Sequence, residues 1–371
     1  MVGQGGNAFG IGYPYFAAKL LLNASFPLDP ASAVAPNLPP TGTVSQIYAF
    51  DPNLKLPYTY QWNFAIEQSL GANQTLSASY VAAVGRRLLR QERIIAPTLF
   101  SGGNTNVFVV RNSATSDYHA MQLQFQRRLS RRLQILASYA WSHSIDIAST
   151  DSSQNTPAIR TDPQLDRGPS DFDVRHAFNA ALTYDIPVST KAALGKALLR
   201  NWSVDGMITA RSATPVNVFY SSFNALLGMV SLRPDLVPGV PLYIVDSTVG
   251  GGRRINPAAF NRVTPAAQLR QGNLGRNSLR GFSLFQLDLG LARKFNVTER
   301  FSIQLRGEAF NLFNHPNFAN PQSSLSTPST FGRSTTMLGR SLGSGGNQAG
   351  FNPLFQVGGP RSFQLSIKTQ F

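Results

Sequence analysis

The sequence contains no cysteine, has few charged residues and lacks long apolar runs. Without a cysteine in 371 residues, it offers no disulfide scaffold, thiolate metal site or cysteine nucleophile. Only 14% of the residues are charged, well below the usual ~25%, which excludes a disordered polyelectrolyte and a coiled coil. No apolar stretch approaches the ~18 residues of a transmembrane helix, so the chain is not a helical membrane protein. A membrane β-barrel is not excluded, because its alternating strands are invisible to hydropathy.

The first residues do not read as a secretory signal, which needs a basic start, an apolar run and a small-residue cleavage site. Met1 to Gly12 carries no charge, and Lys19 interrupts the apolar stretch that follows. If the protein works outside the cytoplasm, we expect this chain to be a fragment. Residues 1–57, rich in Pro, Gly and Asn, are predicted to form an irregular outer loop.

Alternation with a period of two dominates the rest of the chain. Around residues 285–291, Phe285 and Leu287 alternate with Gln286 and Asp288, which is typical of a strand with one apolar and one polar face. The pattern predicts nine strands, at 60–68, 75–84, 121–126, 133–142, 175–185, 202–211, 285–291, 301–308 and 361–371. Other residues expected on the apolar face, as a lipid-facing surface or aromatic girdle, are Tyr60, Trp62, Phe64, Tyr139, Trp141 and Phe301.

The apolar face could meet a second sheet in a soluble sandwich or lipid in an outer-membrane barrel, and alternation alone leaves both open. Connection lengths favour the barrel. Short connections such as 69–74 and 127–132 take turns with long ones such as 86–115 and 212–282. Compact soluble domains rarely contain several connections longer than ~15 residues, whereas outer-membrane barrels have short periplasmic turns and long extracellular loops.

The C-terminal segment 361–371 is a further alternating strand, and it ends on an aromatic residue. Its apolar residues are predicted to form a barrel-assembly signal that consists of Phe363, Leu365, Ile367 and Phe371. If Phe371 is periplasmic, every long connection lies outside. Nine strands is an odd number, and a barrel with both ends in the periplasm needs an even one, so we expect at least one more strand upstream.

Several segments together resemble the barrel of TonB-dependent receptors of the Oar-like kind, abundant in acidobacteria, which carry a carboxypeptidase-regulatory-like domain. The segments that carry the resemblance are 51–90, 117–146, 165–187, 272–295 and 299–321. The resemblance implies an outer-membrane receptor whose long loops capture a ligand and whose plug is moved by TonB from the inner membrane. This chain departs from the family pattern, because it has neither a plug nor a TonB-contacting segment, so any link to TonB would run through parts that this chain lacks.

The net charge of +15 does not indicate nucleic-acid binding, because its arginines are scattered over turns, loops and strand faces. The four histidines form no H-x-x-x-H or H-E-x-x-H pair. We therefore expect no enzyme, no metal and no cofactor. Asp288, Arg306 and Glu308 are predicted to face the lumen and to pair across strands. For His315 and Asn317 in the segment FNLFNHPNF, a structural turn is favoured over a ligand site.

The sequence thus predicts an all-β fold: residues 58–371 form the C-terminal part of an antiparallel transmembrane β-barrel, with about 9–12 strands of a larger barrel. The expected setting is the Gram-negative outer membrane, with lipid, lipopolysaccharide and the barrel-assembly machinery as partners. The expected function is TonB-dependent uptake of an unidentified substrate. Two alternatives remain: a soluble or surface-exposed β-rich binding module, and a gene fragment without function.

Overall fold

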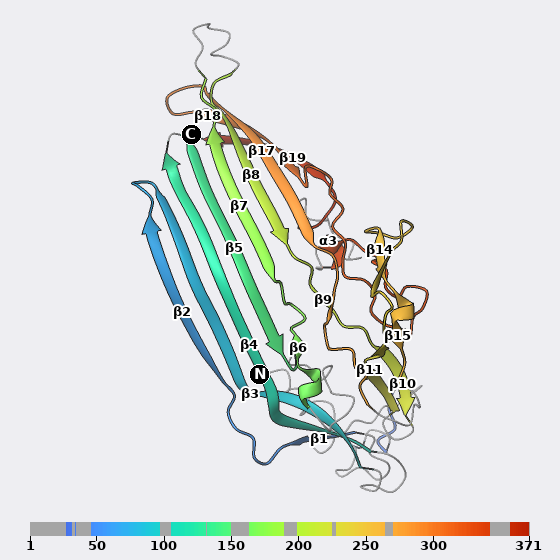
Figure 1. The fold of residues 1–371 in the computed structure, drawn as a ribbon. Coiled ribbons are helices and arrows are strands. Elements are labelled where there is room, and N and C mark those ends of the chain that lie inside the picture. The colour runs from blue at the N-terminus through green and yellow to red at the C-terminus, as the bar shows by residue number, and fades with distance from the viewer. Residues whose placement is uncertain are drawn as a thin grey trace.

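The computed structural model describes residues 27–31, 34, 46–96, 105–130, 132–149, 163–188, 199–224, 228–263, 270–341 and 357–370. The fold is nearly all β: one large curved sheet and several two-stranded sheets beside one of its ends (Figure 1). Within these ranges no helix has both the length and the apolarity to cross a membrane.

The large sheet follows the chain, with each long strand antiparallel to the one before it. Its strands are β2 (Tyr58–Ser69), β3 (Gln74–Ala96), β4 (Thr105–Ser130), β5 (Leu133–Asp146), β7 (His176–Asp185), β8 (Trp202–Arg211), β17 (Leu284–Asn296), β18 (Ser302–Phe310) and β19 (Ser362–Gln370). The predicted antiparallel architecture is confirmed. The sheet is open, because β2 and β19 form its two edges and do not pair with each other.

Strands β3 and β4 are far longer than the sequence pattern predicts. They have 23 and 26 residues, whereas a tilted strand crosses a membrane in about 9–11. The register shifts between Gly85 and Arg90, and such a bulge bends a strand and breaks its alternation. Beyond the bulge the two strands continue as a bent hairpin (Figure 1). Residues Gln46–Phe50 (β1), within the segment predicted as an irregular loop, pair with it in parallel.

The connections at the two ends of the sheet differ in length, as the sequence indicates. At the short-turn end, residues 70–73, 131–132 and 297–301 join neighbouring strands, and 186–201 form an intermediate connection. At the other end, called here the long-connection end, the links include 212–283 and 311–361.

The long connections contain structure of their own, which the alternation does not predict. The described parts of 212–283 and 311–341, called the cap below, hold short strands around a small core. Its buried residues are Val216, Val218, Ile255, Ala259, Phe260, Leu274, Leu279 and Phe331. The short elements of the cap are β9 (Pro215–Val216), β10 (Tyr220–Asn224), β11 (Gly228–Leu232), β12 (Asp235–Leu236), β13 (Tyr243–Val245), β14 (Arg253–Ile255), β15 (Phe260–Asn261), β16 (Leu279–Arg280), the 3₁₀ turn Pro257–Ala259 and α3 (Leu338–Ser341). The connection between β5 and β7 holds the 3₁₀ turn Pro163–Asp166 and β6 (Gly168–Pro169).

The cap core yields a stability prediction. Phe331 is 2% exposed and packs edge-on against Phe260, so Phe331→Ala is expected to destabilise the cap by ~3–5 kcal/mol. Faster hydrogen exchange of the β12–β15 amides would report this loss. The matched control is Phe223→Ala, because Phe223 is 70% exposed. Equal exchange in both variants would show that this core does not hold the cap together.

Candidate functional site

The two faces of the large sheet differ sharply in chemistry. Directly paired residues share a face, so the strand register extends each face across all nine long strands. One face carries, in order, Trp62, Ala82, His119, His143 on β2 to β5 and Leu287, Leu305 and Ile367 on β17 to β19. The opposite face carries mostly Ser, Thr, Gln, Asn and charged residues. We call them the apolar face and the polar face.

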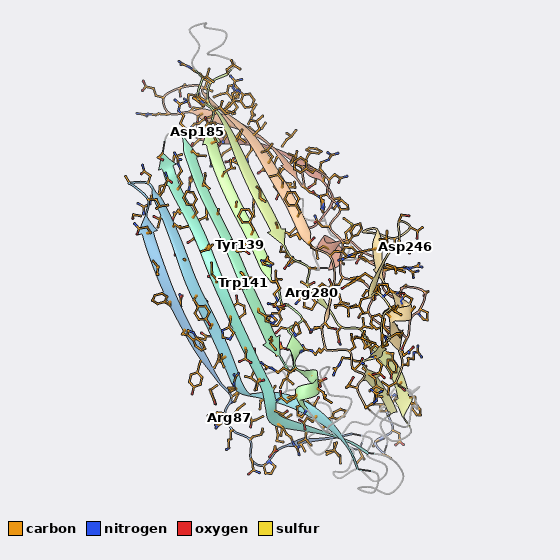
Figure 2. All side chains as sticks on the ribbon, in the orientation of Figure 1. Arg87, Tyr139, Trp141, Asp185, Asp246 and Arg280 are labelled. Carbon is orange, nitrogen blue, oxygen red and sulfur yellow. The ribbon has the colours of Figure 1, made fainter. Side chains whose placement is uncertain are left out.

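The predicted wall residues lie together on the apolar face, although their contact with lipid remains a prediction. Tyr60 is 62% exposed, Phe64 65% and Trp141 54%; Figure 2 labels Trp141 and Tyr139 on β5. Soluble proteins rarely expose apolar surface on this scale. The residues on this face are Tyr60, Trp62, Phe64, Tyr139, Trp141, Phe285 and Leu287. Phe301 lies in the turn just before β18.

The predicted assembly signal maps onto the edge strand β19. Phe363, Leu365 and Ile367 pair with Ala309, Gly307 and Leu305 on the apolar face of β18. Leu365 is 88% exposed. Phe371, the last residue of the predicted signal, lies outside the described residues. Recognition by an assembly machine stays a prediction.

The polar face contains the three charges expected in the lumen, but their pairing differs from the expectation. The Arg306 guanidinium lies 2.5 Å from the Asp205 carboxylate on β8 and 3.0 Å from that of Glu308 on its own strand. Asp205, which the sequence reasoning missed, also accepts a hydrogen bond from Thr183. The expected pairing with an arginine across strands is not found for two of the three: Glu308 pairs with Arg306 on its own strand, and Asp288 makes no ion pair among the described residues.

Asp288 instead accepts hydrogen bonds from the Gln286 side chain, at 2.9 Å, and from the Asn311 backbone N–H, at 2.7 Å. Both partners are buried together with it. A buried carboxylate needs such donors, and here they come from its own strand and from the connection that follows β18.

The Arg306–Asp205 contact depends on the missing side chain of Gly290, which lies between them. Arg306 on β18 reaches Asp205 on β8 across the intervening strand β17, at Gly290. A Cβ at Gly290 would lie 3.1 Å from the Arg306 Nη2 atom and 3.6 Å from the Asp205 Cβ. The chain from Thr183 to Glu308 therefore links three strands over a fourth, and no pattern in the sequence indicates it.

The other half of the polar face is hollowed and neutral. A cavity of about 310 Å³ lies over β3, β4, β5 and β7. Its polar lining consists of hydroxyl and amide side chains, from Ser77, Ser79, Gln122, Gln124, Ser138 and Asn179. Such groups suit contact with water or with uncharged hydrogen-bonding partners.

The segment FNLFNHPNF forms a turn, as the sequence reasoning favoured. Asn311 adopts φ 49°, and its side chain donates to the His315 carbonyl and accepts from the His315 N–H. Asn317 is fully buried, and its side chain accepts from the Phe285 N–H and donates to the Phe285 carbonyl. In both Asn side chains, the amide oxygen and the amide nitrogen are bonded to backbone groups. Asn311 and Asn317 therefore stabilise the turn.

Ion pairs join the cap to the long-connection end of the sheet. Arg276 from the cap lies 2.7 Å from the Asp146 carboxylate at the end of β5. Arg233, also from the cap, lies 2.6 Å from Asp166, which pairs with Arg90 of β3 as well. A Cβ at Gly168 would lie 2.4 Å from the Arg276 carbonyl oxygen, so the backbones meet here.

Asp173 is a third anchor between the cap and the sheet. Burial acts to raise the pKa of its carboxyl, but hydrogen bonds from the Ser144 N–H, His143 and Arg280 outweigh burial and lower the pKa below the ordinary 3.8. Arg280 of the cap lies 2.8 Å from it, and Figure 2 labels Arg280 between sheet and cap. A carboxylate held ionised in this way maintains the contact at neutral pH.

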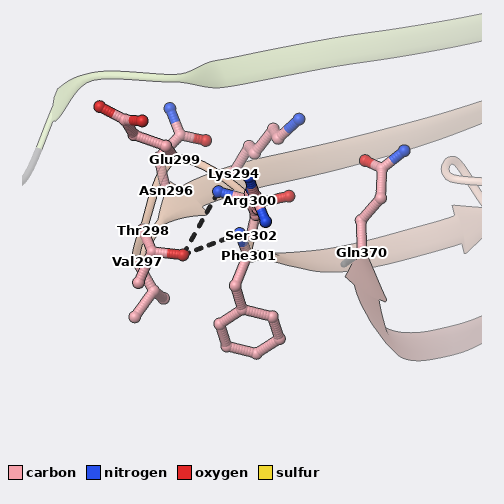
Figure 3. Close-up of a pocket in the computed structure, with 9 residues that line it drawn as sticks. All are labelled: Lys294, Asn296, Val297, Thr298, Glu299, Arg300, Phe301, Ser302 and Gln370. Atoms are coloured by element: carbon pink, nitrogen blue, oxygen red, sulfur yellow. Dashed lines mark hydrogen bonds between the residues drawn. The ribbon is translucent and has the colours of Figure 1, made fainter.

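A larger hollow, of about 840 Å³, lies at the short-turn end around the β17–β18 turn and Gln370 (Figure 3). The Thr298 hydroxyl accepts hydrogen bonds from the Arg300 and Phe301 N–H groups. These bonds close the turn between β17 and β18, and the partners of the hydroxyl are backbone groups rather than a catalytic base. In the parts of the chain that the structure describes, no group of three His, Asp or Glu residues is arranged to hold a metal ion.

A two-faced sheet of this kind is characteristic of membrane barrels, and the comparisons with known proteins identify the family. The model of the family "Outer membrane beta barrel domain" matches residues 7–344. The chain belongs to this family. It is a protein of the Gram-negative outer membrane, and its short turns and long connections correspond to the periplasmic and extracellular sides of such barrels. A search of curated proteins gave no match.

Solved structures with a similar fold include three outer-membrane proteins of low identity. The outer membrane transporter YddB from Escherichia coli is 10% identical, with a TM-score of 0.47, and the match covers 86% of this chain and 33% of that one. The pyoverdine receptor FpvA from Pseudomonas aeruginosa PAO1 is 11% identical, with a TM-score of 0.39 and coverage of 84% and 30%. The copper transporter OprC is 12% identical, with a TM-score of 0.35 and coverage of 86% and 33%. The chain spans about a third of the length of each of these proteins.

The charge chain on the polar face can be tested with a double-mutant cycle. Arg306→Met and Asp205→Asn, singly and together, are expected to give a coupling of about 0.5–1 kcal/mol in urea unfolding, because the partly exposed pair is screened by water. The control cycle combines Asp205→Asn with Lys368→Met on β19, whose position pairs with Gln304. It should give no coupling. Coupling of equal size in both cycles would refute the contact.

Proposed function

We propose that the chain is the C-terminal part of a larger outer-membrane receptor barrel, of the TonB-dependent and Oar-like kind, that takes up a substrate. The observation that carries this proposal is the open sheet. Among the described residues, strands β2 and β19 each have one side without a pairing partner, and unpaired backbone groups in lipid cost several kcal/mol apiece. Further strands must therefore complete the sheet.

The direction of the edge strands argues against closure by these nine strands alone. Because neighbours alternate in direction along the path, the first and ninth strands run the same way. Joining them would need a parallel pair, whereas bacterial single-chain barrels contain an even number of antiparallel strands. An odd number of additional strands resolves the mismatch.

The polar face supports a wide barrel with a wet or plugged interior. In barrels of about eight strands, side chains fill the interior. Here small hydroxyl and amide side chains line a hollow, and charges such as Asp205 and Arg306 satisfy one another. Such a lining needs water or another polar surface opposite it, which a receptor lumen with a plug provides.

We assign the cap to substrate capture, since it stands on the extracellular side and is held to the sheet by buried ion pairs. In this proposal, movement driven by TonB acts through a plug and a TonB-contacting segment of the larger receptor. In this proposal the apolar face contacts lipid and lipopolysaccharide, and β19 is read by the barrel-assembly machinery. The proposal includes no enzymatic step.

The lipid-facing assignment predicts a cost for a charge on the wall. Leu289→Arg, on the apolar face near the middle of β17, is expected to cost ~2–4 kcal/mol in unfolding from lipid vesicles. The control is Thr209→Arg on the adjacent strand β8, where Thr209 pairs with Gln286 on the polar face. An equal loss in both variants would mean that the apolar face does not meet lipid.

Envelope fractionation tests the proposal as a whole. The complete receptor should enrich in the outer membrane and shift its mobility on gels after boiling, which is typical of closed barrels. The nine strands alone, behind a bacterial signal peptide, should give no such shift. A closed barrel from the nine strands would contradict the larger barrel, and a soluble folded product, independent of detergent, would favour a β-rich binding module.

A further inference from the structure

Four arginines lie at the margin of the apolar face, at the long-connection end of the sheet. Arg86 and Arg87 follow the straight part of β3, Arg167 precedes β6, and Arg175 precedes β7. Figure 2 labels Arg87 at this end of the sheet. We call Arg86, Arg87, Arg167 and Arg175 the arginine row.

The row lies at the level where the strands leave the hydrocarbon. Counted from the short-turn end, Arg86 lies 12 residues beyond Gln74, and Arg175 lies 10 residues before Asp185. A tilted strand crosses the apolar core in about 9–11 residues. These guanidinium groups therefore stand at headgroup depth on the extracellular side.

Contacts with strand residues hold the row on the lipid side rather than in the lumen. Asp117 pairs in register with Val84 and Ile145 on the apolar face. The guanidinium groups of Arg86 and Arg167 each lie 2.7 Å from the Asp117 carboxylate.

Arg175 and Arg87 also contact residues of the apolar face. The Arg175 guanidinium lies 3.1 Å from the Nε2 atom of His143, which pairs with His119 on the apolar face. Arg87 is exposed and lies over the Tyr58 ring, 5.4 Å from its centroid.

The row carries excess positive charge. Arg86 and Arg167 each keep 37% of their side-chain surface exposed, and Arg175 keeps 40%. The carboxylates paired with the row are those of Asp117 and Asp173, and Asp173 also pairs with Arg280 of the cap. In the described part of the chain, four guanidinium groups thus share two carboxylates, and Arg87 is paired with neither of them.

Aromatic residues form a band, called the belt below, that extends from the row toward the middle of the apolar face. Tyr and Trp concentrate at membrane interfaces because one end of each ring system is apolar and the other is polar. The Tyr80 hydroxyl lies 2.8 Å from His119 Nδ1, and the Tyr139 hydroxyl lies 2.7 Å from His176 Nδ1. Exposed members of the belt are Tyr58, Tyr60, Trp62, Tyr80 and Trp141.

We propose that the arginine row binds the phosphate groups of an anionic glycolipid of the outer leaflet. The inference rests on the proposed function, because it requires the barrel to stand in the membrane with its long connections outside. Arginine matches the geometry of a phosphate with two parallel hydrogen bonds, and the belt below offers a surface for acyl chains. A lipid is the occupant, because the row faces the lipid side at headgroup depth.

The test measures lipid binding by the complete receptor, extracted in detergent. Fluorescent diphosphoryl lipid A is titrated into the wild type and into the double variant Arg87→Gln/Arg175→Gln. This variant leaves the Asp117 carboxylate paired and leaves Arg280 on Asp173, which preserves the fold. Affinity for the lipid is expected to fall about tenfold, the equivalent of one lost charge-assisted contact.

The matched control is Arg262→Gln/Arg270→Gln in the cap. Arg262 lies over the Tyr220 ring, and Arg270 pairs with Asp235, so this variant loses the same two kinds of contact and the same charge. It should bind lipid A like the wild type. Dephosphorylated lipid A should bind weakly to all three proteins, and excess inorganic phosphate should displace little of the intact lipid.

Three results would overturn the proposal. They are equal binding of phosphorylated and dephosphorylated lipid, equal affinity in the row and cap variants, and displacement of the lipid by inorganic phosphate at matching concentration, which would assign the row to free phosphate. A wild-type receptor that shows no boiling-dependent shift would instead contradict the proposed function, so the two failures are distinguishable.

Discussion

The large sheet depends on the requirement that backbone N–H and C=O groups in lipid be paired within the protein. An antiparallel sheet meets this requirement along its interior, and its alternating side chains then separate into an apolar and a polar face. The same requirement makes the edges β2 and β19 the most informative part of the molecule. A sheet that ends in two unpaired strands is incomplete in a membrane, whatever the sequence of its loops.

Outside the membrane the physical constraints change. The connections of the long-connection end fold around an apolar core that includes Ile255 and Phe331. Arginines of the cap then meet aspartates at the sheet margin, as Arg276 does with Asp146. Buried ion pairs of this kind add little net stability but strongly penalise the loss of one partner, so they fix where the cap stands on the sheet.

Part of the site could be read from the sequence, because period-two alternation is a local signal. Leu287 and Asp288 fall on opposite faces in any strand that contains them, and the three Asn residues and the Pro of FNLFNHPNF indicate a turn. Pairing between strands has no such local signal. The partner of Arg306 is Asp205, about a hundred positions away, and the contact depends on the absence of a side chain at Gly290. The arginine row likewise forms only when β3 and the connection 147–175 come to lie together.

The sequence by itself determined the strands, their faces and the alternation of short and long connections, because each depends on neighbours in the chain. Only the tertiary structure decided that the long connections form a cap with its own core, that the sheet stays open, and that Arg86 and Arg167 converge on Asp117. These features depend on residues that lie far apart in the chain. Their positions follow from strand register and a bulge, which a pattern of polar and apolar residues does not encode.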